Sequence, residues 1–171
     1  DVKIQVEFNP NIVKGYRLVG YENRLLNDED FLDDSKDAGE LGAGHTVTAL
    51  YEVILLGEGS DFLKDVPELK YSSLKRVTPS EKEELLTVKF RYKKPSKTQS
   101  IEMVHIQENK ISEPSKDMQF VTAVALFGMK LRKSQYIKDV EKSTIIDLAK
   151  NGRGDDVEGY RAEFIRLVKS I

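Results

Sequence analysis

Apolar and polar residues alternate along the first hundred or so residues of the chain. Val2, Ile4, Val6 and Phe8 alternate with polar neighbours, which is typical of a strand with one buried face. The same period of two recurs at 16–22, 46–56, 86–92 and 100–108. Turn residues separate most of these segments, so the pattern predicts an antiparallel β-sandwich over residues 1–112. Residues 57–84 lack a clear period, and we expect a long connection there.

The pattern changes after Pro114, where apolar residues follow one another at helical spacing. The spacing predicts one helix that begins at Ser115 or Asp117, a second over 140–150, and a third from about 156 to the end. Each helix is too short to be stable alone in water. We therefore expect residues 113–171 to form a three-helix segment packed on the sandwich, which gives an α+β fold in one compact unit.

The connection between the second and third helices contains "NGRGDD". A glycine there suits the left-handed backbone beyond the end of a helix. An aspartate after it, Asp155, is expected to cap the next helix.

The composition is that of a folded globular domain, with 39% hydrophobic and 33% charged residues among 171. No apolar run approaches the roughly 18 residues of a membrane helix, so this segment is not expected to span a membrane. The chain has no cysteine, which excludes disulfides and thiolate metal sites. Because it opens at Asp1 without a methionine, we expect it to be an excised or processed piece of a larger protein.

Charge is distributed unevenly around a net value of −2. Residues 1–70 carry 15 acids and 7 bases, and residues 71–171 carry 14 acids and 20 bases. This asymmetry could steer an ionic partner, but we favour charge complementarity between the two halves. The basic segment 89–97 could grip a nucleic acid strand with Phe90 and Tyr92. These rings alternate with the bases, so we expect them in the core, the bases protecting an edge strand, and no nucleic-acid partner.

Seven carboxylates lie between residues 28 and 40, where a hard cation such as Ca²⁺ would relieve their repulsion. The spacing matches neither an EF-hand loop nor a metal-adhesion loop. The alternatives are a solvated acidic loop and a calcium site, and no other cofactor is expected. The candidate calcium ligands are Asp30, Asp33, Asp34, Asp37 and Glu40.

Gly42, Gly44 and His45 follow the acidic residues and form a candidate functional loop. A catalytic histidine would need a nucleophile and an orienting partner nearby, and the sequence holds no recognisable nucleophile motif. We therefore expect no catalytic residues: the glycines form a bend and His45 bonds to backbone. A hydrolase that uses His45 is the less favoured alternative.

Several long stretches together resemble one bacterial family. They are "VKIQVEFNP", "YRLVGYENRLL", "DEDFLDDSKDAGELGAGHTVTALYEV", "FVTAVALFGMKLRKSQY" and "GYRAEFIRLV". The chain is similar over nearly its whole length to the domain of unknown function that follows a von Willebrand factor type A domain in bacterial exported proteins. The metal-binding loop of the type A domain is absent here, and the family has no established catalytic residues.

The resemblance implies an extracytoplasmic location, in the periplasm or at the cell surface. It implies a noncatalytic accessory or protein-interaction module that is the C-terminal module of a larger protein. Its partners would be the type A domain of the same parent chain and an unidentified protein. A calcium-responsive binding domain that uses residues 28–40 is the alternative.

Overall fold

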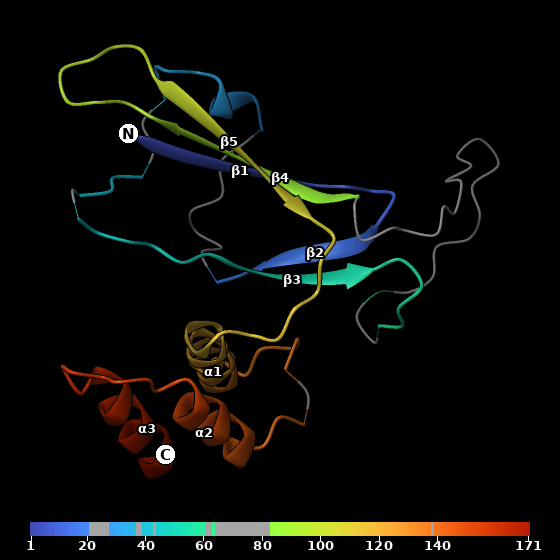
Figure 1. Cartoon of the computed structure of the whole chain (residues 1–171), viewed down its shortest axis with the longest axis vertical. Coiled ribbons are helices and arrows are strands. Elements are labelled where there is room, and N and C mark those ends of the chain that lie inside the picture. The colour runs from blue at the N-terminus through green and yellow to red at the C-terminus, as the bar shows by residue number, and fades with distance from the viewer. Residues whose placement is uncertain (21–27, 37–38, 43, 61–62, 64–82, 138) are drawn as a thin grey trace. The chain divides into compact units, whose positions relative to one another are not determined.

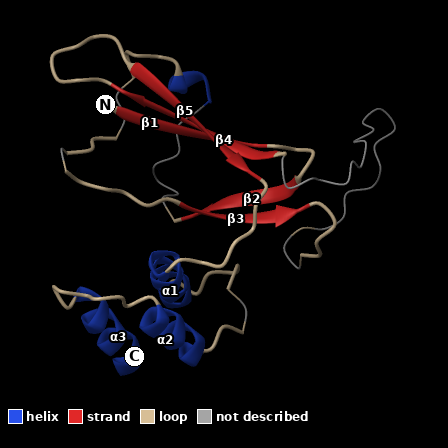
Figure 2. Ribbon diagram, in the orientation of Figure 1, coloured by secondary structure: helices blue, strands red, loops and turns tan. Residues whose placement is uncertain are grey.

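The computed structural model describes residues 1–20, 28–36, 39–42, 44–60, 63, 83–137 and 139–171 (Figures 1 and 2). The chain divides into two compact units, Asp1–Lys110 and Ile111–Ile171. The first contains two antiparallel sheets and the second three helices. The predicted α+β class is therefore confirmed. The packing of the helices on the sheets stays a prediction.

A three-stranded sheet joins segments that lie far apart in the sequence. Its strands are β1 (Val2–Phe8), β4 (Glu84–Tyr92) and β5 (Ile101–Glu108), in the order β1-β4-β5. All neighbours are antiparallel. The register places Ile4, Phe90 and Met103 side by side, so these three side chains share one face. The three predicted strands are confirmed within two residues at their ends.

The second sheet pairs β2 (Val13–Val19) with β3 (Leu50–Leu55). The β2 strand begins three residues before the predicted segment 16–22, and β3 is shorter than the predicted 46–56. Phe8 of β1 links the two sheets: its ring stacks on Tyr16 at a centroid distance of 4.1 Å and lies 5.4 Å from Tyr51. Most of the predicted connection 57–84 lies outside the described residues.

The burial of β1 differs from the simple alternation that its sequence predicts. Ile4 is 54% exposed, whereas Lys3, on the opposite face, is only 6% exposed. The Lys3 ammonium donates to the backbone carbonyl oxygens of Asp30, at 2.9 Å, and of Asp33. These hydrogen bonds satisfy the buried charge and offset the cost of removing it from water.

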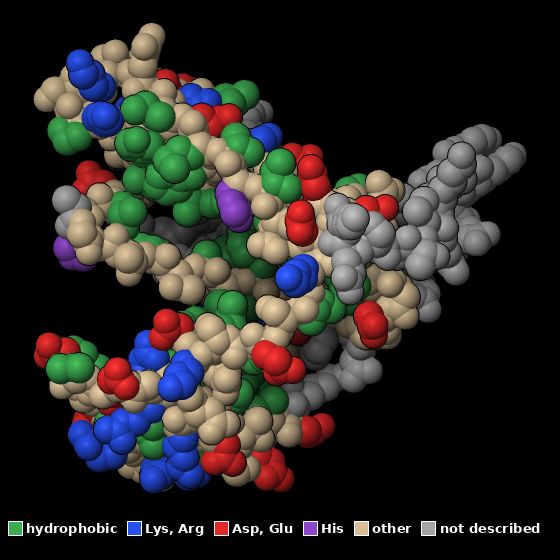
Figure 3. Space-filling model, viewed as in Figure 1, with side chains coloured by type: hydrophobic (Ala, Val, Ile, Leu, Met, Phe, Trp, Pro, Cys, Tyr) green, Lys and Arg blue, Asp and Glu red, His purple; other side chains and the backbone are tan. Residues whose placement is uncertain are grey.

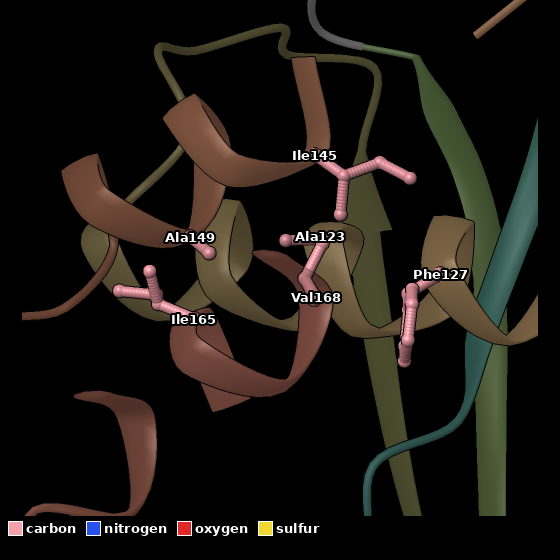
Figure 4. Packing of buried hydrophobic residues seen from close by; sticks show 6 residues of the cluster. All are labelled: Ala123, Phe127, Ile145, Ala149, Ile165 and Val168. Atoms are coloured by element: carbon pink, nitrogen blue, oxygen red, sulfur yellow. The ribbon is translucent and has the colours of Figure 1, made fainter. Parts of the chain in front are cut away.

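The helical unit consists of α1 (Lys116–Leu131), α2 (Lys142–Asn151) and α3 (Tyr160–Ser170). The Ser115 hydroxyl accepts from the Met118 N–H at 3.1 Å, so the predicted cap of α1 is confirmed. One cluster of buried residues joins the three helices (Figure 4): Ala123, Phe127, Ile145, Ala149, Ile165 and Val168.

The connection from α2 to α3 combines a close approach with a cap. A Cβ on Gly152 would lie 2.5 Å from the Phe120 backbone nitrogen, so only glycine fits there. Gly154, Asp156 and Gly159 have left-handed backbone, with φ of 59°, 45° and 75°. The predicted cap at Asp155 is wrong, because the Asp156 carboxylate accepts from the N–H groups of Arg161 and Ala162 at 2.9 and 2.8 Å.

Candidate functional site

The acidic loop, residues 28–40, is anchored to the three-stranded sheet by an aromatic side chain. The 3-10 helix η2 (Asp28–Phe31) contacts β1 and directs Phe31 inward, where it is buried. The Arg91 guanidinium lies over the Phe31 ring at 5.7 Å from its centroid, a cation–π arrangement. Farther along, the Val2 N–H donates to the Gly39 carbonyl oxygen at 2.7 Å, which ties the end of the acidic loop to β1.

Three basic side chains of the sheet unit bind this loop, and we call Lys3, Arg91 and Lys93 the cation cluster. Arg91 donates to the Asp34 carboxylate at 3.2 Å. Lys93 donates to the Asp34 carbonyl oxygen and also to the Asp1 carboxylate, the latter at 2.6 Å. Lys3 and Arg91 are direct neighbours in the register of β1 and β4. Arg91 therefore neutralises one carboxylate of the acidic loop, while Lys3 and Lys93 hold its backbone.

The hydrogen bonds of the loop favour ionised carboxylates. Ser35 donates two hydrogen bonds to the Asp33 carboxylate, from its hydroxyl at 2.6 Å and from its backbone N–H at 2.8 Å. Both lower the pKa of Asp33 below its ordinary value. Hydrogen bonding with Ser100 lowers the pKa of Asp34, helped by Arg91 and opposed by partial burial. Both carboxylates are thus engaged by neighbours of the same chain.

The cation cluster encloses little free space. A cavity of about 10 Å³ lies among Asp1, Lys3, Asp34, Arg91, Tyr92, Lys93 and Ser100. A cavity of this size holds roughly one water molecule, whereas small-molecule sites are far larger. The arrangement is a structural network that fastens the acidic loop. The expectation that the basic residues of segment 89–97 protect an edge strand is wrong, because β4 is the central strand of its sheet.

The structure places the five predicted calcium ligands in different surroundings. The Asp30 carboxylate lies 3.8 Å from the Lys36 ammonium, Asp33 and Asp34 bind as described above, and Glu40 is exposed. Asp37 lies outside the described residues. Within the part of the chain that the structure describes, no group of three acidic or histidine side chains could hold a metal ion. Calcium binding that includes Asp37 stays a prediction.

The candidate loop at Gly42, Gly44 and His45 forms a turn on the surface. The His45 N–H donates to the Gly42 carbonyl oxygen at 3.1 Å, and Gly44 has a φ of 79°. A Cβ on Gly42 would lie 3.0 Å from the His45 Nδ1 atom, so the absent side chain leaves room for the imidazole. His45 is exposed and does not line the cavity at the cation cluster. A hydrolytic role for His45 stays an untested alternative.

Sequence reasoning missed the most unusual surface of the sheet unit, which is β5 itself. All eight residues of this strand are exposed. Its four large apolar side chains are between 40% and 58% exposed: Ile101, Met103, Val104 and Ile106. Figure 3 shows hydrophobic side chains gathered over the three-stranded sheet. The signal was available, because apolar residues occur at both odd and even positions and neither face is wholly polar.

No helix in the described part of the chain combines the length and the apolar character needed to cross a membrane.

Comparisons with known proteins identify the family of the chain. The family described as "Uncharacterized protein YfbK, C-terminal" matches residues 1–171. The "Uncharacterized protein YfbK" of Escherichia coli (strain K12) is 41% identical over 170 residues. That match covers 99% of this chain but only 29% of the relative. No solved structure matches the chain. The family match over the whole chain shows that it belongs to the family formed by the C-terminal region of the uncharacterized protein YfbK.

Proposed function

We propose that this chain is a noncatalytic accessory module of a larger cell-envelope protein, and that it binds other protein through its three-stranded sheet. In this proposal it supports a von Willebrand factor type A domain of the same polypeptide and helps to present that domain to a further protein. The sequence resemblance supports the type A domain and the extracytoplasmic location. The length of the E. coli relative, of which the match covers 29%, supports a larger parent protein.

The observation that carries the proposal is the exposure of apolar side chains on both faces of β5. Contiguous apolar surface of this kind is uncommon on proteins that act alone and typically marks a site of protein contact. The polar network around the acidic loop has the opposite character, because its charged groups are paired within the chain and enclose only about 10 Å³. The cation cluster therefore has little room for a small molecule, whereas β5 presents apolar side chains that a protein could cover.

The direct test is to divide the full-length protein into this 171-residue chain and the remaining polypeptide. The two purified pieces are mixed and their association is measured by isothermal titration calorimetry. We expect a one-to-one complex whose formation has a negative heat-capacity change, because apolar surface is buried. If two folded pieces fail to associate, and calorimetry at several temperatures shows no heat, the proposal is wrong. The same division of the E. coli relative provides an independent repeat.

A further inference from the structure

We propose that β5 receives an additional strand from another part of the same full-length protein. The added segment pairs with the free edge of β5 and extends the sheet beyond the order β1-β4-β5. This inference rests on the proposed function, because it requires a larger polypeptide. It adds the mode of binding, the residues involved and the kind of partner.

The position of β5 in the sheet provides the first argument. Among the strands that the structure describes, β4 is the only neighbour of β5. The backbone N–H and C=O groups on the outer side of a terminal strand are free to pair with another chain. The opposite edge differs, because the Val2 N–H of β1 already donates to the Gly39 carbonyl oxygen. The β1 edge thus has one described backbone hydrogen bond on its outer side, and β5 is the more open edge.

The side chains of β5 provide the second argument. Ile101 and Met103 lie on the face that includes Phe90, whereas Val104 and Ile106 lie on the opposite face. Strands with apolar residues on both faces are typical of the buried interior of a sheet, and a terminal strand beside solvent normally has one polar face. Each face of β5 thus carries two exposed apolar side chains beside two polar ones, so neither face has the fully polar character of a solvated edge.

The third argument is the composition of this edge. Natural edge strands avoid unwanted pairing with lysine, proline, bulges or short length. The segment 101–108 contains no lysine, arginine or proline, and it runs for eight residues. The nearest arginine, Arg91 of β4, is engaged with Asp34 and lies 3.7 Å from Glu102. The charged residues of β5 are Glu102 and Glu108. An eight-residue edge without lysine or proline is consistent with a strand that is covered in the working protein.

The occupant follows from the length of the relative. About 71% of the E. coli relative lies outside the matched segment, since the match covers 29%. A strand within the same polypeptide is present at high effective concentration and needs no separate encounter. Strand addition also uses backbone hydrogen bonds for affinity and alternate side-chain contacts for specificity. An extended segment with apolar residues at alternate positions satisfies both faces of β5.

Hydrogen–deuterium exchange tests this inference, comparing the 171-residue chain with the full-length protein. We expect the outward-facing amides of Ile101–Glu108 to exchange at least tenfold more slowly in the full-length protein. The amides of α2 serve as an internal reference and should change by less than twofold.

Two matched variants sharpen the test in the calorimetric binding assay. Val104 is 56% exposed on β5, and Val47 is 61% exposed elsewhere in the same unit. We expect Val104→Lys to weaken binding of the remaining polypeptide at least tenfold and Val47→Lys to change it less than twofold. Because both valines are largely exposed, both variants are expected to fold, which circular dichroism verifies.

The possible failures are distinguishable. If the pieces associate but the β5 amides still exchange rapidly, the proposed function stands and strand addition is overturned. If they do not associate, both are overturned. Slow exchange of β5 in the isolated chain would show that the edge is already covered by the chain itself. Protection that rises with the concentration of the isolated chain would identify a second copy as the occupant. Either result contradicts the inference.

Discussion

The helical unit and the sheet unit bury their apolar side chains in different ways. The helical unit gathers six buried residues from all three helices into one cluster. The buried apolar residues of the described sheet unit are Phe8, Ile12, Val13 and Phe31. The sheet unit leaves Ile4 and the apolar residues of β5 at its surface and relies on a polar network around Lys3 and Arg91. The contrast indicates that the helical unit is built on one apolar core, whereas the described sheet unit combines a smaller set of buried apolar residues with a polar network.

The largest effect that separates the two units is expected from shortening one isoleucine in each. Ile145 is completely buried in the helical core, and Ile4 is 54% exposed. Ile145→Ala should lower the free energy of unfolding of the helical unit by about 2–5 kcal/mol, because it removes apolar contacts and leaves a cavity. Ile4→Ala should lower that of the sheet unit by less than about 1 kcal/mol. Urea titration followed by circular dichroism at 222 nm reports the helices, and the NMR signals of β1 and β4 residues report the sheets.

Equal losses for these two variants would contradict the comparison, since they would show that the exposed face of β1 is packed in solution.

A smaller effect is expected from removing the buried charge that fastens the acidic loop. Lys3→Met keeps the apolar stem but removes the donor to the Asp30 and Asp33 carbonyl oxygens. We expect a loss of about 1–3 kcal/mol in the stability of the sheet unit, because these acceptors lose a charged partner. We also expect faster hydrogen exchange of the Val2 N–H that is bonded to Gly39. Lys97→Met, at an exposed turn, is the control and should be nearly neutral.

A Lys3→Met protein that kept both its stability and its slow Val2 exchange would show that the other contacts, of Phe31, Arg91 and Lys93, hold the acidic loop without Lys3.

The smallest effect concerns pH and the start of α3. Burial raises the pKa of Asp156, whose side chain is 3% exposed. The N–H groups of Arg161 and Ala162, together with Arg153, outweigh this effect and hold the pKa below the ordinary 3.8. A carboxylate whose pKa is lowered in the folded state stabilises that state at pH values above its ordinary pKa. This stabilisation is lost as the pH falls through the lowered pKa. We expect the helical unit to lose stability below about pH 4, and Asp156→Asn to flatten that dependence.

NMR titration of the carboxylates measures the effect directly. Asp155→Asn changes the neighbouring exposed carboxylate and should leave the acid dependence as it was. An Asp156 pKa at or above 3.8 would show that the Asp156 cap does not cause the loss of stability at low pH.

The elements of the fold were largely predictable from the sequence, whereas the direction of burial was not. Strict alternation placed β1, and helical spacing with Ser115 placed the start of α1, because these signals are local. In β1, Lys3 is buried and Ile4 is exposed, the reverse of what the alternation predicts. Burial of Lys3 depends on carbonyl groups of residues 30 and 33, which no local sequence pattern indicates. For the same reason, β4 was mistaken for an edge strand: strand order is set by pairing with β1, about 80 residues away in the sequence.

The candidate site was predictable only as a set of charged residues. The sequence showed dense carboxylates and a basic segment, and complementarity between them was the favoured interpretation. In the described residues, the ion pairs of Asp34 with Arg91 and of Asp1 with Lys93 are examples of this complementarity. Which acid meets which base could not be predicted, because that choice follows from the register of β1 and β4.

The pairing of β1 with β4 also sets an order of events during synthesis. Val2 lies opposite Tyr92, so β1 leaves the ribosome long before its only described partner strand exists. Contacts between such distant residues carry a high loop-closure cost and form slowly. The helices of the second unit instead join neighbours in the sequence, and local contacts of this kind form rapidly. A nascent chain therefore carries an unpaired β1 through most of the translation of the sheet unit, and in that interval the N-terminal strand is the segment most exposed to aggregation or to capture by a chaperone.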